Sequence, residues 1–277
     1  MTHLRKEVIQ DRLPTMFQQF LELDEIDISK EKMEVAPTAH YSMGGVITDM
    51  KCRTKVKGLL AVGEVISQIH GANRLGGNSL LDTLVFGKIA GREASIFAKQ
   101  LPTPKDNPSE SEAYNDIQKF EKDLFVVLDN PLSFRKEIQD IMDQVAGIVR
   151  SASSLQKGLE KILALKDRFY SQIRIFQKNE LNNENLIKNF IMTLEVRSSL
   201  VVCESIIRSA FMRKESRGAH FRSDFPNIDN DVWHVNIYCT KVGGKMILYK
   251  QNVKEVKGIL KEVIRDHSKP IHNNESE

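Results

Sequence analysis

The chain has 277 residues, of which 41% are hydrophobic and 28% are charged, and its formal net charge is +3. This length fits one large domain or two modest ones, and the composition is that of an ordinary globular protein. Charges of both signs are interspersed, which argues against a nucleic-acid-binding protein, and no apolar run reaches the roughly 18 residues of a membrane span. We therefore expect a soluble, cytoplasmic protein that meets a membrane only through partners.

Three cysteines, Cys52, Cys203 and Cys239, are isolated in the sequence. Their spacing fits neither a zinc or iron–sulfur site nor a disulfide framework. We predict no metal site in this chain.

The first hundred residues mix short extended segments with helices. The pattern predicts a helix over 1–23 that is interrupted at Pro14, an extended segment at 35–40, a β-like run at 46–48, a buried strand at 58–64 and a long helix at 79–99. Asn78 or Ser79 is placed to cap the long helix. Three prolines at 102, 104 and 108 then mark a linker.

After the linker the pattern becomes mainly helical. Amphipathic periodicity predicts three helices over 134–150, 155–176 and 185–212, which bury their apolar stripes by packing on one another. A polar elbow follows at Lys214–Pro226. The chain then predicts a hairpin of 233–238 and 245–249, closed at 242–244, and a last helix over 253–266.

Two glycine-containing segments, 37–45 and 70–82, break every regular pattern. Glycine pairs let backbone amides approach a ligand closely, and the second pair opens directly onto a helix start at Asn78 and Ser79. Unpaired N–H groups and the helix dipole make such a start an anion site, although it equally fits a plain N-cap. Arg74 has a planar guanidinium that suits a carboxylate, although a surface ion pair is its simpler interpretation. His40 is either a catalytic histidine or a hydrogen-bonded structural one.

Three motifs in this order resemble one family closely. They are His-Tyr-Ser-Met-Gly-Gly at 40–45, Gly-Leu-Leu-Ala-Val-Gly-Glu at 58–64 and His-Gly-Ala-Asn-Arg-Leu-Gly-Gly-Asn-Ser-Leu-Leu-Asp at 70–82. The chain resembles the flavoprotein subunits of succinate dehydrogenase and fumarate reductase, with L-aspartate oxidase as near kin. Similarity continues at 12–14, 145–150 and 215–222, and so covers the C-terminal half of that family's chain.

The resemblance implies FAD as cofactor and a dicarboxylate, succinate or fumarate, as substrate. His40 and Arg74 match the residues that bind the dicarboxylate. The cofactor-binding residues it implies are Glu64, at the FAD ribitol or ribose, together with Gly45, Asn78, Ser79 and Leu80. The family's proton-delivering arginine and the Gly-x-Gly-x-x-Gly turn have no counterpart in this sequence, so we assign no catalytic residue.

The implied fold is α+β: a C-terminal fragment of an FAD-binding domain, then a three-helix bundle and a small hairpin and helix. We expect the end of a capping domain at 1–35, the FAD-binding part at 36–100, a linker at 101–110, the bundle at 111–232 and the hairpin and helix at 233–277.

The implied function is the C-terminal portion of a succinate dehydrogenase or fumarate reductase flavoprotein. It would need an N-terminal Rossmann and capping half, an iron–sulfur subunit, and membrane anchors on the cytoplasmic face. Two alternatives are an L-aspartate oxidase-like fragment, which the glycine pair Gly76–Gly77 and Asp82 disfavour, and a non-catalytic remnant that docks an iron–sulfur subunit.

The polar elbow at 214–226 has two interpretations. Its charges are solvated and the preceding helix is capped at Gly218, or the elbow folds back to brace the region of His40 and Arg74.

Overall fold

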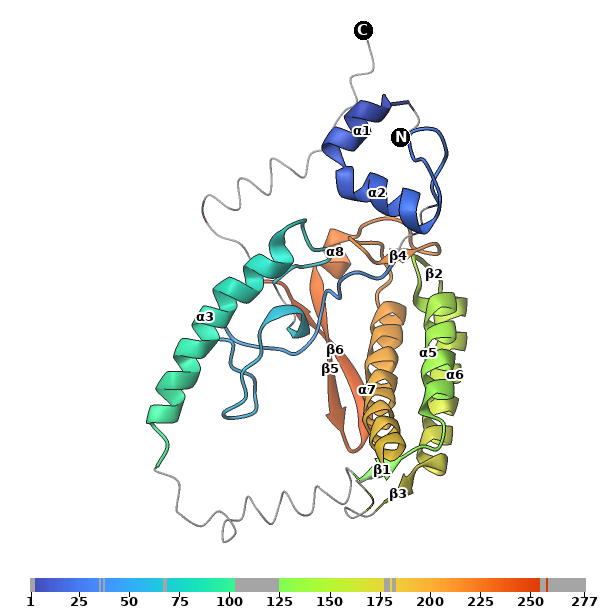
Figure 1. Ribbon diagram of the computed structural model, residues 1–277. Helices are drawn as coiled ribbons and strands as arrows, with labels where there is room; N and C mark the ends of the chain where they lie inside the picture. The colour runs from blue at the N-terminus through green and yellow to red at the C-terminus, as the bar shows by residue number, and fades with distance from the viewer. Residues whose placement is uncertain are drawn as a thin grey trace. The chain divides into compact units, whose positions relative to one another are not determined.

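The computed structural model describes residues 3–34, 36, 38–66, 69–102, 125–176, 180, 183–254 and 258. The chain forms two compact units, whose helices and strands are labelled in Figure 1. The first consists of the described residues of Met1–Ile69 and Gly76–Ala90, and the second of those of His70–Leu75 and Gly91–Glu277. The fold combines short strands, several helices and a C-terminal hairpin, which confirms the expected α+β class.

The first unit opens with two short helices, α1 (Lys6–Arg12) and α2 (Pro14–Leu23). Their small core consists of Ile9, Phe17 and Ile28. Pro14 stands at the first position of α2, where its missing N–H costs nothing, and its ring ends α1. The predicted interruption at this proline is confirmed.

The buried strand predicted over 58–64 is wrong. Leu60 makes only an isolated bridge to Arg53, and η1 (Gly63–Val65) begins within the predicted strand. Leu59 is half exposed. The β-like run at 46–48 is likewise a single bridge between Val46 and Ile66. A strand requires a neighbouring strand to satisfy its backbone, and the described part of this unit supplies only single bridges.

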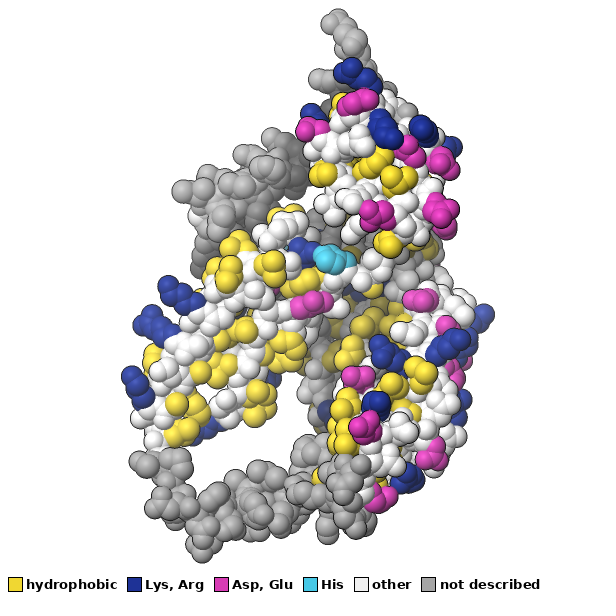
Figure 2. Space-filling view, viewed as in Figure 1, with side chains coloured by type: hydrophobic (Ala, Val, Ile, Leu, Met, Phe, Trp, Pro, Cys, Tyr) yellow, Lys and Arg dark blue, Asp and Glu magenta, His cyan; other side chains and the backbone are white. Residues whose placement is uncertain are grey.

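A long helix, α3 (Asn78–Lys99), follows as predicted. It buries Asp82 and Ala90, while Leu80 is 74% exposed. Hydrophobic side chains are gathered along it (Figure 2); the exposed ones include Leu80, Leu81, Leu84, Val85 and Ile96. Little of the described chain covers this apolar face.

The second unit is built on three helices that lie side by side, α5 (Pro131–Ala146), α6 (Ala152–Gln172) and α7 (Glu184–Met212) (Figure 1). Side-chain oxygens of Asn130, Ser151 and Asn183 cap their N-termini. The predicted bundle is confirmed, with starts and ends shifted by up to four residues. Its core consists mainly of Leu128, Phe134, Ile138, Ile141, Val145, Leu155, Ile162, Leu165, Phe169, Val196, Leu200 and Ile207.

Two pairs of two-residue strands lie near the bundle helices in the chain. β1 (Val126–Val127) pairs antiparallel with β3 (Arg174–Ile175), and β2 (Val149–Arg150) pairs parallel with β4 (Phe221–Arg222).

The C-terminal hairpin is confirmed, although its strands are longer than predicted. A single turn of helix, α8 (Asn230–Trp233), precedes β5 (Val235–Val242) and β6 (Lys245–Asn252), which are joined by Gly243 and Gly244. Most of the predicted linker and nearly all of the last predicted helix lie outside the described residues. None of the described helices is both long and apolar enough to cross a bilayer.

Candidate functional site

The segment around the first glycine pair is tied to Glu64 and its neighbours. The backbone N–H of Ser42 donates to Glu64 Oε1 at 2.8 Å, and that of Val46 donates to the carbonyl of Val65, also at 2.8 Å. A Cβ on Gly45 would lie 2.2 Å from Val65 O, so this glycine is required for the close backbone approach. A Cβ on Gly44 would meet nothing within 4 Å, which leaves open space beside it.

Glu64 itself is exposed. Its oxygen Oε1 accepts the hydrogen bond from Ser42 N–H. Within the described part of the chain, no group donates to its second oxygen, Oε2. The carboxylate is therefore oriented through one oxygen and can accept a hydrogen bond from a ligand hydroxyl through the other.

A second contact fixes the segment that carries His40. The hydroxyl of Tyr41 donates to Oδ2 of Asp82 at 3.2 Å, and Asp82 is only 5% exposed in the second turn of α3. His40, the neighbour of Tyr41, is itself exposed. This hydrogen bond holds the His40 backbone close to the start of α3.

The start of α3 combines open space with backbone groups that can bind a ligand. A side chain at Gly76 or Gly77 would meet nothing within 4 Å, and Gly77 has a φ of +80°. Asn78 and Ser79 are half-buried, and the first turn contains no acidic residue to neutralise the helix dipole. The first N–H groups of a helix lack intrahelical partners, so this end suits an anion or a polar ring edge. An FAD fits these residues, because the open glycines leave room in front of the donors.

Arg74 belongs to the second unit, in the segment His70–Leu75. It is half-buried, and its Nη1 donates to the carbonyl of Leu75 at 3.1 Å. The carbonyl of Ala72 accepts a hydrogen bond of 3.1 Å from the backbone N–H of Ala219, in the polar elbow. The structure places the remaining residues predicted for this site in the first unit: His40, Gly45, Glu64, Asn78, Ser79 and Leu80.

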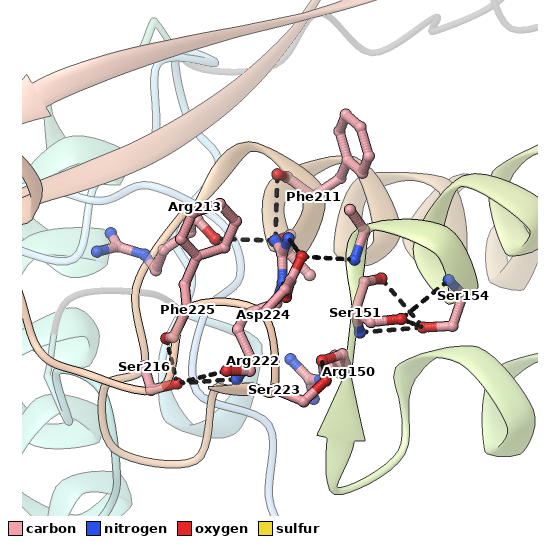
Figure 3. Close-up of polar contacts among 12 residues, drawn as sticks. Arg150, Ser151, Ser154, Phe211, Arg213, Ser216, Arg222, Ser223, Asp224 and Phe225 are labelled. Atoms are coloured by element: carbon pink, nitrogen blue, oxygen red, sulfur yellow. Dashed lines mark hydrogen bonds and ion pairs between the residues drawn. The ribbon is translucent and has the colours of Figure 1, made fainter.

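The polar elbow (Lys214–Pro226) is not a solvated helix end. Helix α7 ends at Met212, so the prediction of a cap at Gly218 is wrong. Arg222 is 1% exposed, and its Nη1 donates to the carbonyls of the last residues of the helix, Ala210 and Phe211, and to that of Arg213 (Figure 3). A buried guanidinium thus does the capping that the sequence pattern assigned to glycine.

Glu215 is the second buried charge of the elbow, at 1% exposure. Burial pushes its pKa upward, but hydrogen bonds from the Arg217 side chain, the Asp229 backbone and the Arg213 side chain outweigh burial and lower the pKa. Sequence reasoning did not predict the burial of either charge, because their neighbours Arg213, Arg217 and Asp224 supply only part of their hydrogen bonds. The rest come from the end of α7 and from the backbone of Asp229. The only available signal was the density of charge in a segment without periodicity.

Comparisons with known proteins give the class and then the family. A model described as "FAD binding domain" matches residues 1–80, and one described as "Fumarate reductase flavoprotein C-term" matches residues 135–264. An uncharacterized FAD-dependent oxidoreductase of Methanocaldococcus jannaschii is 39% identical, with 85% of this chain and 41% of the relative covered. A chain of the fumarate reductase (CoM/CoB) of Methanothermobacter marburgensis is also 39% identical, with 81% of this chain and 39% of the relative covered.

A solved structure agrees with these relatives. The FrdA chain of Escherichia coli quinol fumarate reductase superposes with a TM-score of 0.78 at 33% identity, covering 92% of this chain and 44% of that one. The class is that of FAD-dependent oxidoreductases. The chain belongs to the fumarate reductase and succinate dehydrogenase flavoprotein family, which has L-aspartate oxidase among its relatives. It spans about two fifths of the length of the curated relatives it matches.

Proposed function

We propose that this chain is the C-terminal portion of a flavoprotein that interconverts succinate and fumarate. An N-terminal half, supplied in trans or as part of a longer chain, would contribute the Rossmann and capping segments. The observation that carries the proposal is the open glycine pair, Gly76 and Gly77, in front of an uncompensated helix start. Packing among the described residues gives no reason for this open backbone, whereas a bound cofactor does.

The FAD that these residues would hold supplies hydride chemistry, taking a hydride from succinate or giving one to fumarate, while the accompanying proton would be exchanged through a group of the N-terminal half. Glu64 would hold a ribitol or ribose hydroxyl through Oε2, since Ser42 N–H already fixes the other oxygen. The backbone amides at Asn78, Ser79 and Leu80 would face the ring, and Gly45 would allow the neighbouring backbone to approach it closely. The protein would bind the cofactor and the substrate, and it would orient and polarise the substrate.

Two side chains would hold the dicarboxylate. Arg74 offers a planar pair of donors that matches a carboxylate in bidentate fashion, and His40 offers a ring nitrogen from an exposed position. The Tyr41–Asp82 hydrogen bond keeps the backbone of His40 in place. Arg74 and His40 would each serve as a hydrogen-bonding partner for a carboxylate of the substrate.

The assembly would include further proteins. One solved relative is a quinol fumarate reductase, and we infer by analogy that membrane anchors and an iron–sulfur subunit serve this chain as well. An L-aspartate oxidase-like activity is the alternative within the family; the pair Gly76–Gly77 and Asp82 favour the succinate and fumarate branch.

The test is a complex in which the Rossmann and capping segments are restored. In it, Arg74→Lys should lower succinate or fumarate turnover by about a hundredfold, because a point charge cannot replace the bidentate fork. FAD content should stay unchanged. Arg92→Lys, on an exposed position of α3, is the matched control and should retain full turnover.

Unchanged kinetics in Arg74→Lys would remove that residue from the substrate site. A restored complex that holds FAD but turns over neither dicarboxylate would support the non-catalytic docking role. Turnover of L-aspartate in place of succinate would assign the chain to the oxidase branch.

A further inference from the structure

The tip of the polar elbow touches the segment that carries Arg74. Ala219 N–H donates to Ala72 O at 3.1 Å, and a Cβ on Gly218 would lie 2.3 Å from that same oxygen. Ala72 is two positions before Arg74 in the chain. We propose that Gly218 and Ala219 are positioning residues that fix the backbone of His70–Leu75 and thereby aim the Arg74 guanidinium. The functional part of this inference rests on the role proposed above for Arg74.

The tip is a closed turn rather than a loose loop. Arg217 N–H donates to His220 O at 2.8 Å, and His220 N–H donates to Arg217 O at 3.0 Å. The Arg217 side chain is held by Glu215 through Nε at 2.8 Å and Nη2 at 3.0 Å. Since Glu215 is buried, the turn is held by hydrogen bonds to a carboxylate in the interior of the protein.

The base of the elbow is anchored to the helices α6 and α7 and to β2, the short strand that follows α5. Arg222 binds the end of α7 and makes a bidentate pair with Asp224 at 2.7 and 2.8 Å (Figure 3). Asp224 also accepts the N–H of Ala152, in the first turn of α6, at 2.9 Å. Ser223 N–H donates to Arg150 O at 2.9 Å, just after α5. Displacing the tip would therefore require breaking buried, charge-assisted hydrogen bonds.

The structure supplies a matched comparison for the glycine at the tip. Gly218 has a φ of +58° and Gly243, in the hairpin turn, has a φ of +55°. A side chain at either position meets the same backbone strain. Only at Gly218 would the added Cβ collide with another segment, because nothing lies within 4 Å of a Cβ on Gly243.

Hydrogen–deuterium exchange on the full chain tests the contact without any cofactor. In Gly218→Ala, amides of residues 70–75 should exchange at least about fivefold faster, which corresponds to the loss of one ordinary hydrogen bond. In Gly243→Ala their exchange should match the wild type, and the exchange of the bundle core should be unchanged in both variants. Replacing the amide of Ala219 by an ester removes the donor without adding a collision, and it should accelerate exchange at 70–75 to a similar degree.

Kinetics in the restored complex test the consequence. Gly218→Ala should raise KM for the dicarboxylate about tenfold with FAD content retained, whereas Gly243→Ala should leave KM unchanged. Wild-type exchange at 70–75 in both Gly218→Ala and the ester would overturn the contact. Faster exchange with an unchanged KM would overturn its link to Arg74. A wild-type complex without dicarboxylate turnover would refute the proposed function instead, and the exchange result would still decide the contact.

Discussion

At the scale of single residues, buried charge distinguishes the elbow from an ordinary helix end. A guanidinium or carboxylate taken out of water is costly unless each of its donors and acceptors is met. Arg222 meets three backbone carbonyls and one carboxylate, and Glu215 meets two arginines and a backbone N–H. Removing either partner of such a pair leaves the other unsatisfied, so these residues specify one conformation of the segment.

His220 should make the second unit sensitive to mild acid. Burial first, and then the nearby charge of Arg150, lower its pKa to about 4 from 6.5; Arg213 and Arg222 add smaller repulsions, partly offset by the Arg213 backbone carbonyl. Its Nδ1 faces Nη1 of Arg150 at 3.1 Å, which requires a neutral ring that accepts. Below pH 6.5 the unfolded state binds this proton more readily than the folded state does. Stability is therefore complete above pH 6.5 and falls as pH drops towards 4.

Urea unfolding between pH 7 and 5 measures this effect, since Glu215 and Asp224, whose pKa values are also lowered, lose their contribution only at lower pH. His220→Gln should flatten the dependence in this window, because glutamine does not titrate. The wild-type slope in His220→Gln would contradict the assignment to His220.

At the scale of elements, α5 and α6 approach each other through a glycine. A Cβ on Gly158 would lie 2.4 Å from Cγ2 of Val145, whose side chain is buried and whose branched Cβ leaves it few rotamers. Gly158→Ala should destabilise the bundle by about 1–2 kcal/mol in urea unfolding. The overpacking cost of about 1–3 kcal/mol exceeds the gain in helix propensity of about 1 kcal/mol.

Two further variants test that reasoning. Gly87→Ala, in α3, places its Cβ in open space and should stabilise the chain by up to about 1 kcal/mol. Adding Val145→Ala to Gly158→Ala should cost less than the two single changes together, with a coupling of about 1 kcal/mol or more. Strict additivity would mean that Gly158 and Val145 do not share a contact.

An element could be predicted from the sequence where local interactions determine it, and could not where it depends on residues distant in the chain. The bundle helices follow from apolar side chains at helical spacing, which is a local property. The segment 58–64 has the apolar run of a buried strand, but whether a strand forms depends on distant partners that a single sequence does not display. The predicted cap at Gly218 was wrong for the same reason. Capping of α7 by Arg222 joins residues about ten positions apart, whereas the cap rules for glycine look only a few residues ahead.

For the candidate site, the sequence motifs identified notable residues, but they did not predict all the contacts that these residues make in the structure. Gly45 was singled out for approach to a ligand, and the structure gives it a packing reason as well, against Val65. The helix start at Asn78 was predicted to within one residue, together with its open glycines. The hydrogen bond from Ser42 to Glu64 could not be predicted, because it depends on how two irregular segments meet.

At the scale of the whole molecule, the chain matches about two fifths of the length of its relatives, and α3 presents an apolar surface. Helix α3 exposes a row of leucines and valines, although an amphipathic helix is stabilised mainly by burying such a face. We expect the N-terminal half to cover it. Hydrogen exchange along α3 should slow when the two halves are combined, while exchange in α5, α6 and α7 should stay the same.

FAD binding should likewise require both halves. The chain has no Gly-x-Gly-x-x-Gly turn, and that turn holds the pyrophosphate on which the affinity for a dinucleotide largely depends. Purified alone, the chain should therefore contain little FAD, and in the restored complex it should contain about one FAD per flavoprotein, as measured by visible absorbance after gel filtration. Glu64→Gln should lower the FAD content of the complex, since it weakens an acceptor oriented by Ser42; Glu93→Gln, on α3, should not. Tight, stoichiometric FAD in the isolated chain would show that the residues from His40 to Leu80 suffice for binding, and would refute the shared site.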